Sequence, residues 1–319
     1  MIVGLNEETH WKCIDYYKSH EEIPSLGFSP DSDFPCIYAE KSVLSLCISD
    51  KVLSDKLISI IDIDCNNNAI NVVPKFCSVT LKLDNSIDLS TIQSAINKFG
   101  YNIEINELED YTIKLSSYGL ASHSAHPDLG VNAISHLIIV LNEIFKNYKI
   151  DFSLFDNFCK FIGDEYYGAK IGLNVEDESG KLTLNSSQLY IENDKIFIGF
   201  NLRIPVNTDV GIVIDKFGQC FSTNNVTVLS KMDSLFVDKN DKLVKTLCDV
   251  FNSSYNSDFE PIAIGGATYA RAFPNCVSFG MNFPGDKDMC HQVDEFIDID
   301  KLMLATNIYA KAIYELLNF

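Results

Sequence analysis

The stretch DKIFIGFNLRIPVNTDVGIVIDKFGQCFSTNNVTVLSK (194–231) decides the fold class of this chain. From residue 196 to residue 204 it has an apolar side chain at every second position, which predicts a β-strand with one buried face. DVGIVIDKFGQCF (209–221) then has the apolar spacing of a helix, and VTVLSK (226–231) again predicts a strand. A strand, a helix and a second strand within 38 residues indicate a sheet that is covered by helices on one face.

The same alternation extends toward the N-terminus and defines a middle block from residue 42 to residue 236. Its other predicted strands are SVLSLCIS (42–49), KLISIIDID (56–64) and KFCSVTLKL (75–83). Its other predicted helices are STIQSAINKFG (90–100) and NAISHLIIVLNEIF (132–145). We therefore expect an α+β domain over residues 42–236.

The two flanking blocks, 1–41 and 237–319, are each small for an independent core. In the first, Asn6 is expected to cap a helix that buries Trp11, Ile14 and Tyr17, with two glutamates in its first turn. The second block has a helix at KLVKTLCDVF, short strands at PIAIGG and VSFG, and a long amphipathic helix from residue 298. We expect the two blocks to pack together as one domain, with the middle block inserted between them.

Composition excludes several classes of function. The chain has 319 residues, 46% of them hydrophobic, and a net charge of −19, which repels nucleic acids and anionic membranes. Its ten cysteines contain no Cys-x-x-Cys pair, which favours reduced thiols and a cytoplasmic protein. The start of the sequence lacks the pattern of a signal peptide, and no apolar run has the length of a membrane span.

Arginine is rare, because the 25 basic residues include only Arg203 and Arg271. A guanidinium binds a carboxylate through two parallel hydrogen bonds, so each arginine indicates either anion binding or a buried ion pair. Of the six histidines, His123 and His291 lie in loops rich in glycine, proline and aspartate, where side chains can reach a ligand.

Six motifs, in this order and at this spacing, resemble a known family. They are GLNEETHWKC (4–13), FSPDSDFP followed by AEK (28–41), GLASHSAHPDLGVNA (119–133), NLRIP (201–205), GGATYAR (265–271) and FPGDKDMCHQVDEF (283–296). The chain resembles the di-zinc exopeptidases related to aminoacylase and carboxypeptidase, and within them the PepV-type Xaa-His dipeptidases. The resemblance implies an α/β fold: part of a zinc-exopeptidase catalytic domain, a mixed sheet with helices, and an inserted α+β ferredoxin-like lid domain.

The resemblance also implies a role for each motif residue in hydrolysis of an unblocked dipeptide by metal-activated water. Glu7 is the expected general base and acid, and His123 the residue that contacts the developing oxyanion. Arg203 is expected to bind the free carboxylate of the dipeptide, and Asn71 to help hold it. The expected metal ligands are Glu8, Asp31 and His291, with zinc as the metal. The expected lining of the substrate pocket is Gly265, Gly266 and Thr268.

One part of the family's pattern has no counterpart in this sequence. The family's N-terminal third carries a His-x-Asp motif and an Asp that bridges two zinc ions. The single His-x-Asp here, His126 to Asp128, lies in the loop of His123. We therefore expect a C-terminal fragment that binds zinc weakly and hydrolyses dipeptides weakly or not at all alone. Self-association is expected to mask its uncovered apolar surface. One alternative is half of a split enzyme that a separate N-terminal chain completes, and the other is a non-catalytic remnant that binds peptides or a partner through the lid cleft.

Overall fold

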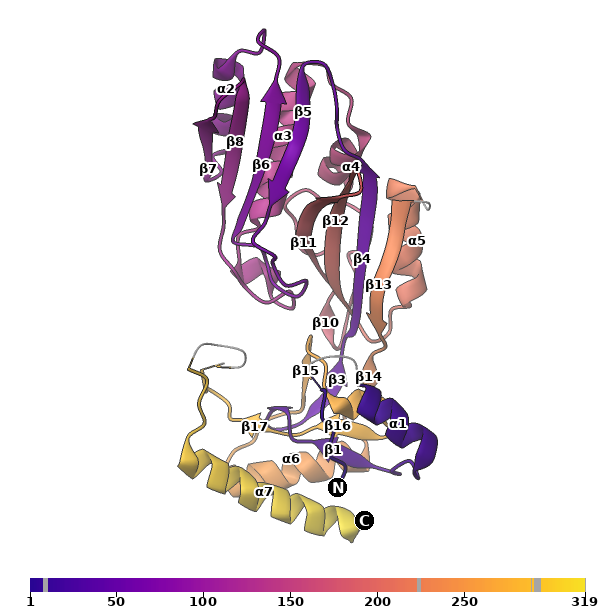
Figure 1. The fold of residues 1–319 in the computed structure, drawn as a ribbon. Helices are drawn as coiled ribbons and strands as arrows, with labels where there is room; N and C mark the ends of the chain where they lie inside the picture. The colour runs from indigo at the N-terminus through magenta and orange to yellow at the C-terminus, as the bar shows by residue number, and fades with distance from the viewer. Residues whose placement is uncertain (8–10, 223–224, 288, 290–293, 319) are drawn as a thin grey trace. The chain divides into compact units, whose positions relative to one another are not determined.

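The computed structural model describes residues 1–7, 11–222, 225–287, 289 and 294–318. The chain forms two compact units: residues 42–232, and residues 1–41 together with 233–319. Figure 1 shows the elements of each unit, with seven α-helices among the described residues. The mixed α/β fold that the sequence predicts is confirmed.

The first sheet of the 42–232 unit has the strand order β11-β12-β4-β13, and all neighbours are antiparallel (Figure 1). The strands are β4 (Ser42–Lys51), β11 (Thr183–Glu192), β12 (Lys195–Ile204) and β13 (Val226–Met232). Along the chain, helix α4 (Ser153–Phe161) precedes β11 and helix α5 (Val210–Phe221) precedes β13. A strand, helix, two strands, helix and strand in this order form the ferredoxin-like motif that was expected.

A second sheet is inserted between β4 and α4, with the antiparallel order β5-β6-β8-β7. Its elements are β5 (Ile58–Asp64), β6 (Phe76–Leu83), α2 (Leu89–Phe99), β7 (Ile103–Glu107), β8 (Thr112–Tyr118) and α3 (Ala133–Asn147). The short elements β9 (Glu176–Asp177), β10 (Gly180–Lys181) and the 3-10 helix η1 (Pro127–Leu129) complete the unit. Helix α3 packs on both β6 and β11, so one continuous apolar core serves both sheets.

The other unit has a mixed sheet around β3 (Ile37–Glu40), which is fully buried. Its strands are β1 (Gly27–Ser29), β14 (Leu235–Phe236), β15 (Ile262–Ile264) and β16 (Cys276–Ser278), with a separate parallel pair of β2 (Ser32–Asp33) and β17 (Met281–Asn282). Its helices are α1 (Lys12–His20), α6 (Lys242–Tyr255), α7 (Ile299–Leu317) and the 3-10 helix η3 (Tyr269–Ala272). Helices α6 and α7 pack against each other. The core of this unit is aromatic: the ring centroid of Phe34 lies 4.8 Å from that of Phe251 and 5.0 Å from that of Phe279.

Five of the seven α-helices among the described residues start at a side-chain cap. Each of them begins after an Asp or Asn whose side chain accepts a backbone N–H of the first turn, namely Asp88, Asn132, Asp209, Asp241 and Asp298. Helix α4 has no side-chain cap. For α1, the prediction of a helix start at Asn6 is wrong. The helix begins at Lys12, after Trp11 in a left-handed conformation, so Glu7 precedes the helix. The side chain of Asn6 still accepts the N–H of Cys13 at 3.3 Å.

Two further features differ from the sequence prediction. Residues 233–236 do not belong to the middle block, because β14 pairs with β3 of the other unit. The expectation of reduced thiols throughout is also wrong, because Cys65 and Cys77 form a disulfide. Residues 64 and 78 are paired across β5 and β6, so the two cysteines lie directly opposite each other at the end of this ladder. Among the described residues, no helix is both long enough and apolar enough to cross a membrane.

Candidate active site

His123 and Asn71 lie on two loops of the 42–232 unit that are joined by backbone hydrogen bonds. The N–H of Ser124 donates to the carbonyl of Asn71 at 2.9 Å, and that of Val73 donates to the carbonyl of Ser122 at 2.8 Å. Val72 and His123 thereby form an isolated antiparallel bridge. Both predicted side chains are exposed, although the residue after His123 is fully buried. The structure therefore brings these two predicted residues together on a firmly held pair of loops.

Arg203 lies next to these loops, near the end of β12. It is 5% exposed and is paired with Thr183 on β11 and with Val43 on β4. The hydroxyl of Thr183 donates to the carbonyl of Ser124 at 2.9 Å. Arg203 is thus the cross-strand neighbour of Thr183, which contacts the His123 loop. The 42–232 unit therefore holds all three of its predicted site residues in one region.

In the other unit, Glu7 lies close to the GGATYAR segment. The indole N–H of Trp11 donates to the carbonyl of Glu7. The rings of Trp11 and Tyr269 form a T-shaped pair whose centroids are 5.2 Å apart. Partial burial and a contact with the Cys13 thiol raise the pKa of Tyr269 to about 12, and the charge of Glu7 adds to this shift. The same contact lowers the pKa of the Cys13 thiol. These contacts connect the Glu7 segment to the segment that begins with Gly265 and Gly266.

Asp31 lies in the bend between β1 and β2 and is exposed. The next residue, Ser32, donates its N–H to the carbonyl of Gly280 at 2.7 Å. Burial, and secondarily the carboxylate of Asp31, raise the pKa of Tyr309 on α7 well above its ordinary value. Asp31 is therefore close enough to Tyr309 for its charge to affect the pKa of this tyrosine.

The predicted pocket residues Gly265, Gly266 and Thr268 form a turn whose position depends on a buried carboxylate. Glu40, at 0% exposure, accepts the hydroxyl of Thr268 at 2.8 Å and its N–H at 3.1 Å. It also accepts the Arg271 Nε at 2.9 Å and the hydroxyl of Ser278 at 2.8 Å. Arg271 therefore forms a buried ion pair with Glu40. A buried ion pair was one of the two roles expected for an arginine in a chain with so few of them. Thr268 is itself 3% exposed, and its hydroxyl already has Glu40 as its partner.

Arg271 also binds three backbone carbonyls. Its Nη1 donates to Asp233 at 2.9 Å, and its Nη2 donates to Gly266 at 2.8 Å and to Lys41 at 3.2 Å. Lys41 and Asp233 are the two residues at which the chain leaves and re-enters this unit. One guanidinium therefore fixes both of these crossing points and the Gly266 turn.

Two predicted metal ligands, Glu8 and His291, lie outside the described residues. Within the described ranges, no group of three or more His, Cys, Asp or Glu side chains is arranged to hold a metal ion. Asp31 and its described neighbours thus do not form a complete zinc site, because a catalytic zinc usually has three protein ligands.

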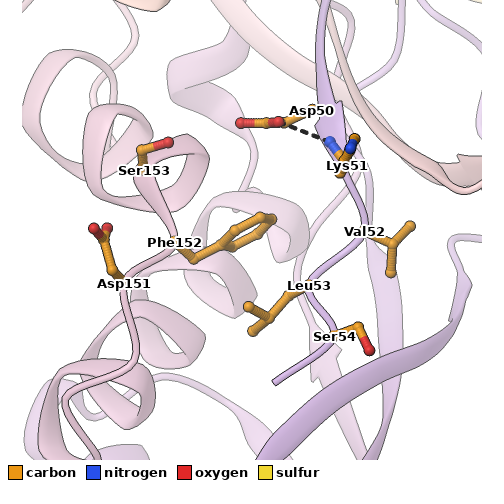
Figure 2. Close-up of a pocket in the computed structure, with 8 residues that line it drawn as sticks. All are labelled: Asp50, Lys51, Val52, Leu53, Ser54, Asp151, Phe152 and Ser153. Atoms are coloured by element: carbon orange, nitrogen blue, oxygen red, sulfur yellow. Dashed lines mark hydrogen bonds between the residues drawn. The ribbon is translucent and has the colours of Figure 1, made fainter. Parts of the chain in front are cut away.

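A cavity of about 270 Å³ lies elsewhere in the 42–232 unit, between the end of β4 and the start of α4 (Figure 2). Its lining includes Asp50, Lys51, Phe152 and Ser153 and none of the predicted site residues. Lys51 pairs with Lys195 whereas Val43 pairs with Arg203, so this cavity and Arg203 lie at opposite ends of β4. It is therefore a separate feature of the sheet.

Comparison with known proteins identifies the family. Residues 13–315 match the peptidase family M20/M25/M40. The chain belongs to this family. Among curated M20 relatives, "Putative dipeptidase YtjP" of Bacillus subtilis (strain 168) is 34% identical over 325 residues, which cover 99% of this chain and 69% of that protein. "Putative dipeptidase SAB1611c" of Staphylococcus aureus (strain bovine RF122 / ET3-1) is 34% identical over 331 residues, which cover 99% of this chain and 69% of that protein.

Solved structures similar to this M20 chain include the aminoacylhistidine dipeptidase from Vibrio alginolyticus. The match has 12% identity and a TM-score of 0.45, and it covers 91% of this chain and 65% of that one. Human carnosine dipeptidase 1 matches with 10% identity and a TM-score of 0.44, over 97% of this chain and 62% of that one. The chain therefore spans about two thirds of the length of the proteins that it matches.

Proposed function

We propose that this M20 chain acts on unblocked dipeptides as a hydrolase. Both relatives from Bacillus subtilis and Staphylococcus aureus carry the name "Putative dipeptidase", and they align with 99% of this chain. The structural observation that carries the proposal is the grouping of Arg203, His123 and Asn71. A nearly buried guanidinium beside a loop that presents an imidazole and an amide suits a short ligand with one free carboxylate.

In the proposed reaction each side chain has one task. Arg203 binds the carboxylate of the dipeptide, and Asn71 holds the peptide in register. Glu7 takes a proton from the attacking water and passes it to the leaving amine. His123 donates a hydrogen bond to the carbonyl oxygen as negative charge develops on it. The Gly265 and Gly266 turn offers its backbone to the substrate, since neither residue has a side chain.

Zinc is part of the proposal, with Glu8, Asp31 and His291 as its protein ligands. The described residues do not form a complete set, so the steps above are those of the protein's own side chains. Three ligands are few for the two zinc ions that the resemblance implies, so we expect this chain to retain zinc weakly and to turn over slowly, below about 1 per second.

The first test is hydrolysis of a dipeptide such as Ala-His by the purified chain, with zinc, manganese or cobalt added, followed by liquid chromatography. Slow hydrolysis that stops when a chelator is added, and that is absent with the carboxamide form of the same dipeptide, supports the proposal. Equal hydrolysis of the acid and the carboxamide would contradict carboxylate recognition. A turnover well above 1 per second would contradict the expectation of a weak metal site.

The second test concerns Arg203 alone. Arg203→Ala is expected to weaken binding of a dipeptide about tenfold or more, because a charge-assisted hydrogen bond contributes roughly 1.5–3 kcal/mol. The binding constant can be measured by NMR titration of labelled protein, without added metal. The matched control is Lys51→Ala, at the opposite end of the sheet, which should leave the constant unchanged. Identical titration curves for wild type and Arg203→Ala would remove Arg203 from the substrate site.

A further inference from the structure

We propose that Asn185 is the positioning residue of this site: its buried side-chain amide fixes the loops of Asn71 and His123 to β11, beside Arg203. The inference rests on the proposed function, because those loops matter for catalysis only if they bind substrate. Asn185 contacts no substrate itself, since it is 1% exposed and lies within the sheet.

The amide of Asn185 connects three segments that are distant in sequence. Its Nδ2 donates to the carbonyl of Val72 at 3.0 Å and to the hydroxyl of Ser124 at 2.8 Å. Its Oδ1 accepts a hydrogen bond from Nδ2 of Asn132 at 3.0 Å. Val72 directly follows Asn71, and Ser124 directly follows His123. One side chain therefore holds both predicted substrate residues through their immediate neighbours.

The surrounding residues make this arrangement rigid. Asn132 caps helix α3 by accepting the N–H of Ser135 at 2.9 Å, and its Nδ2 also donates to the carbonyl of Ser186 at 2.8 Å. Thr183 lies two residues before Asn185, on the same face of the strand, and binds the carbonyl of Ser124. Ser124, Asn132 and Thr183 are all nearly or fully buried. In a buried environment each of these hydrogen bonds is strong, and the loss of a partner is costly.

The chemistry of the network requires an amide at position 185. Both N–H groups of Nδ2 donate hydrogen bonds to oxygen atoms, while Oδ1 accepts a hydrogen bond from the amide of Asn132. An aspartate has no proton to donate when ionised and would place a buried charge against two oxygens, and an alanine would leave the polar groups unpaired. The position thus has a specific side-chain requirement that burial alone would not impose.

The chain contains a matched control for Asn185. Asn201 on β12 is its direct cross-strand partner and is also 1% exposed. Its Nδ2 donates to the hydroxyl of Ser45 at 3.0 Å, within the sheet. Truncation of either asparagine removes the same buried amide from the same sheet, but among these contacts only those of Asn185 reach the two loops.

The experiment compares Asn185→Ala, Asn201→Ala and wild type as full chains, by amide hydrogen exchange and by NMR titration with Ala-His. In Asn185→Ala, the amides of Val73 and Ser124 should exchange about tenfold faster or more, as expected for loss of one to two hydrogen bonds. Amides of β4 and β12 should keep their protection, and dipeptide binding should weaken by a similar factor. In Asn201→Ala, both loop amides should exchange as in wild type.

Unchanged exchange at Val73 and Ser124 in Asn185→Ala, or equal acceleration in Asn201→Ala, would overturn the proposal. Ser124→Ala removes a single hydroxyl partner and provides a milder variant if Asn185→Ala does not fold. It should accelerate exchange at the same amides by a smaller factor, and no acceleration would likewise overturn the proposal. If wild type fails to bind any dipeptide, the proposed function is wrong, while the exchange data still decide the role of Asn185.

Discussion

Arg271→Ala should lower the free energy of unfolding of the unit formed by residues 1–41 and 233–319 by about 3–5 kcal/mol. The substitution leaves the carboxylate of Glu40 buried at 0% exposure with its cation removed. It also deprives the carbonyls of Lys41, Asp233 and Gly266 of their hydrogen-bond donor. Denaturant unfolding followed by tryptophan fluorescence reports on this unit, because Trp11 is the single tryptophan of the chain.

Two variants test the reason for this loss. Lys301→Ala removes a surface cation of the same unit, which is paired with Asp286 and is 45% exposed, so a much smaller loss of stability is expected. The double variant Glu40→Gln with Arg271→Ala should be more stable than Arg271→Ala, because no unpaired charge then remains buried. If Arg271→Ala destabilises this unit no more than Lys301→Ala, the ion pair does not hold the unit together.

Gly119→Ala should lower the free energy of unfolding by about 3 kcal/mol and should also weaken dipeptide binding. A Cβ at this position would lie 2.0 Å from the carbonyl oxygen of Val131 and 3.1 Å from the N–H nitrogen of Ala133. Both are backbone atoms, so the chain itself must shift. The bridge between Leu120 and Val131 closes the base of the His123 loop at this point, and the shift would open it.

The control for Gly119→Ala is Gly211→Ala, in the first turn of α5. There the nearest atom to a new Cβ is Oδ1 of the Asp209 side chain at 3.2 Å, and alanine is the better helix former. This variant should be neutral or slightly more stable in thermal unfolding. A Gly119→Ala protein with wild-type stability and wild-type dipeptide binding would show that the loop base tolerates a side chain.

The sequence predicts a helix or strand well where the apolar pattern within that single segment is clear. Alternating apolar residues identify β12, and apolar periodicity identifies α3, α5 and α7, since these patterns reflect one buried face. Helix α4 was not predicted, although its buried residues Leu154, Phe155 and Phe158 have helical spacing. Strand β11 was not predicted because polar residues interrupt its apolar alternation. Polar Asn185 and Ser187 in β11 are buried by tertiary contacts that no local pattern reveals.

The same distinction applies to the candidate site. Motif order and spacing led to Asn71, His123 and Arg203, and the structure places these three in one region of one unit. The rarity of arginine indicated that Arg271 needs a partner, but its spacing could not identify Glu40, which is 231 residues away. Asn185 had no sequence signal, because its importance lies entirely in three partners from other segments.

The Arg271 side chain has a consequence for how this protein can be rebuilt. Lys41 and Asp233 are the attachment points of a 191-residue insertion from Ser42 to Met232, and their carbonyl oxygens share one guanidinium. Attachment points that lie this close can be joined by a short linker without stretching the host, which is the geometry that tolerates the excision or exchange of whole inserts. Residues 42–232 could therefore be exchanged between relatives by recombination of their genes. At the junction such an exchange needs to preserve little more than Glu40 and Arg271, the pair that holds its two ends.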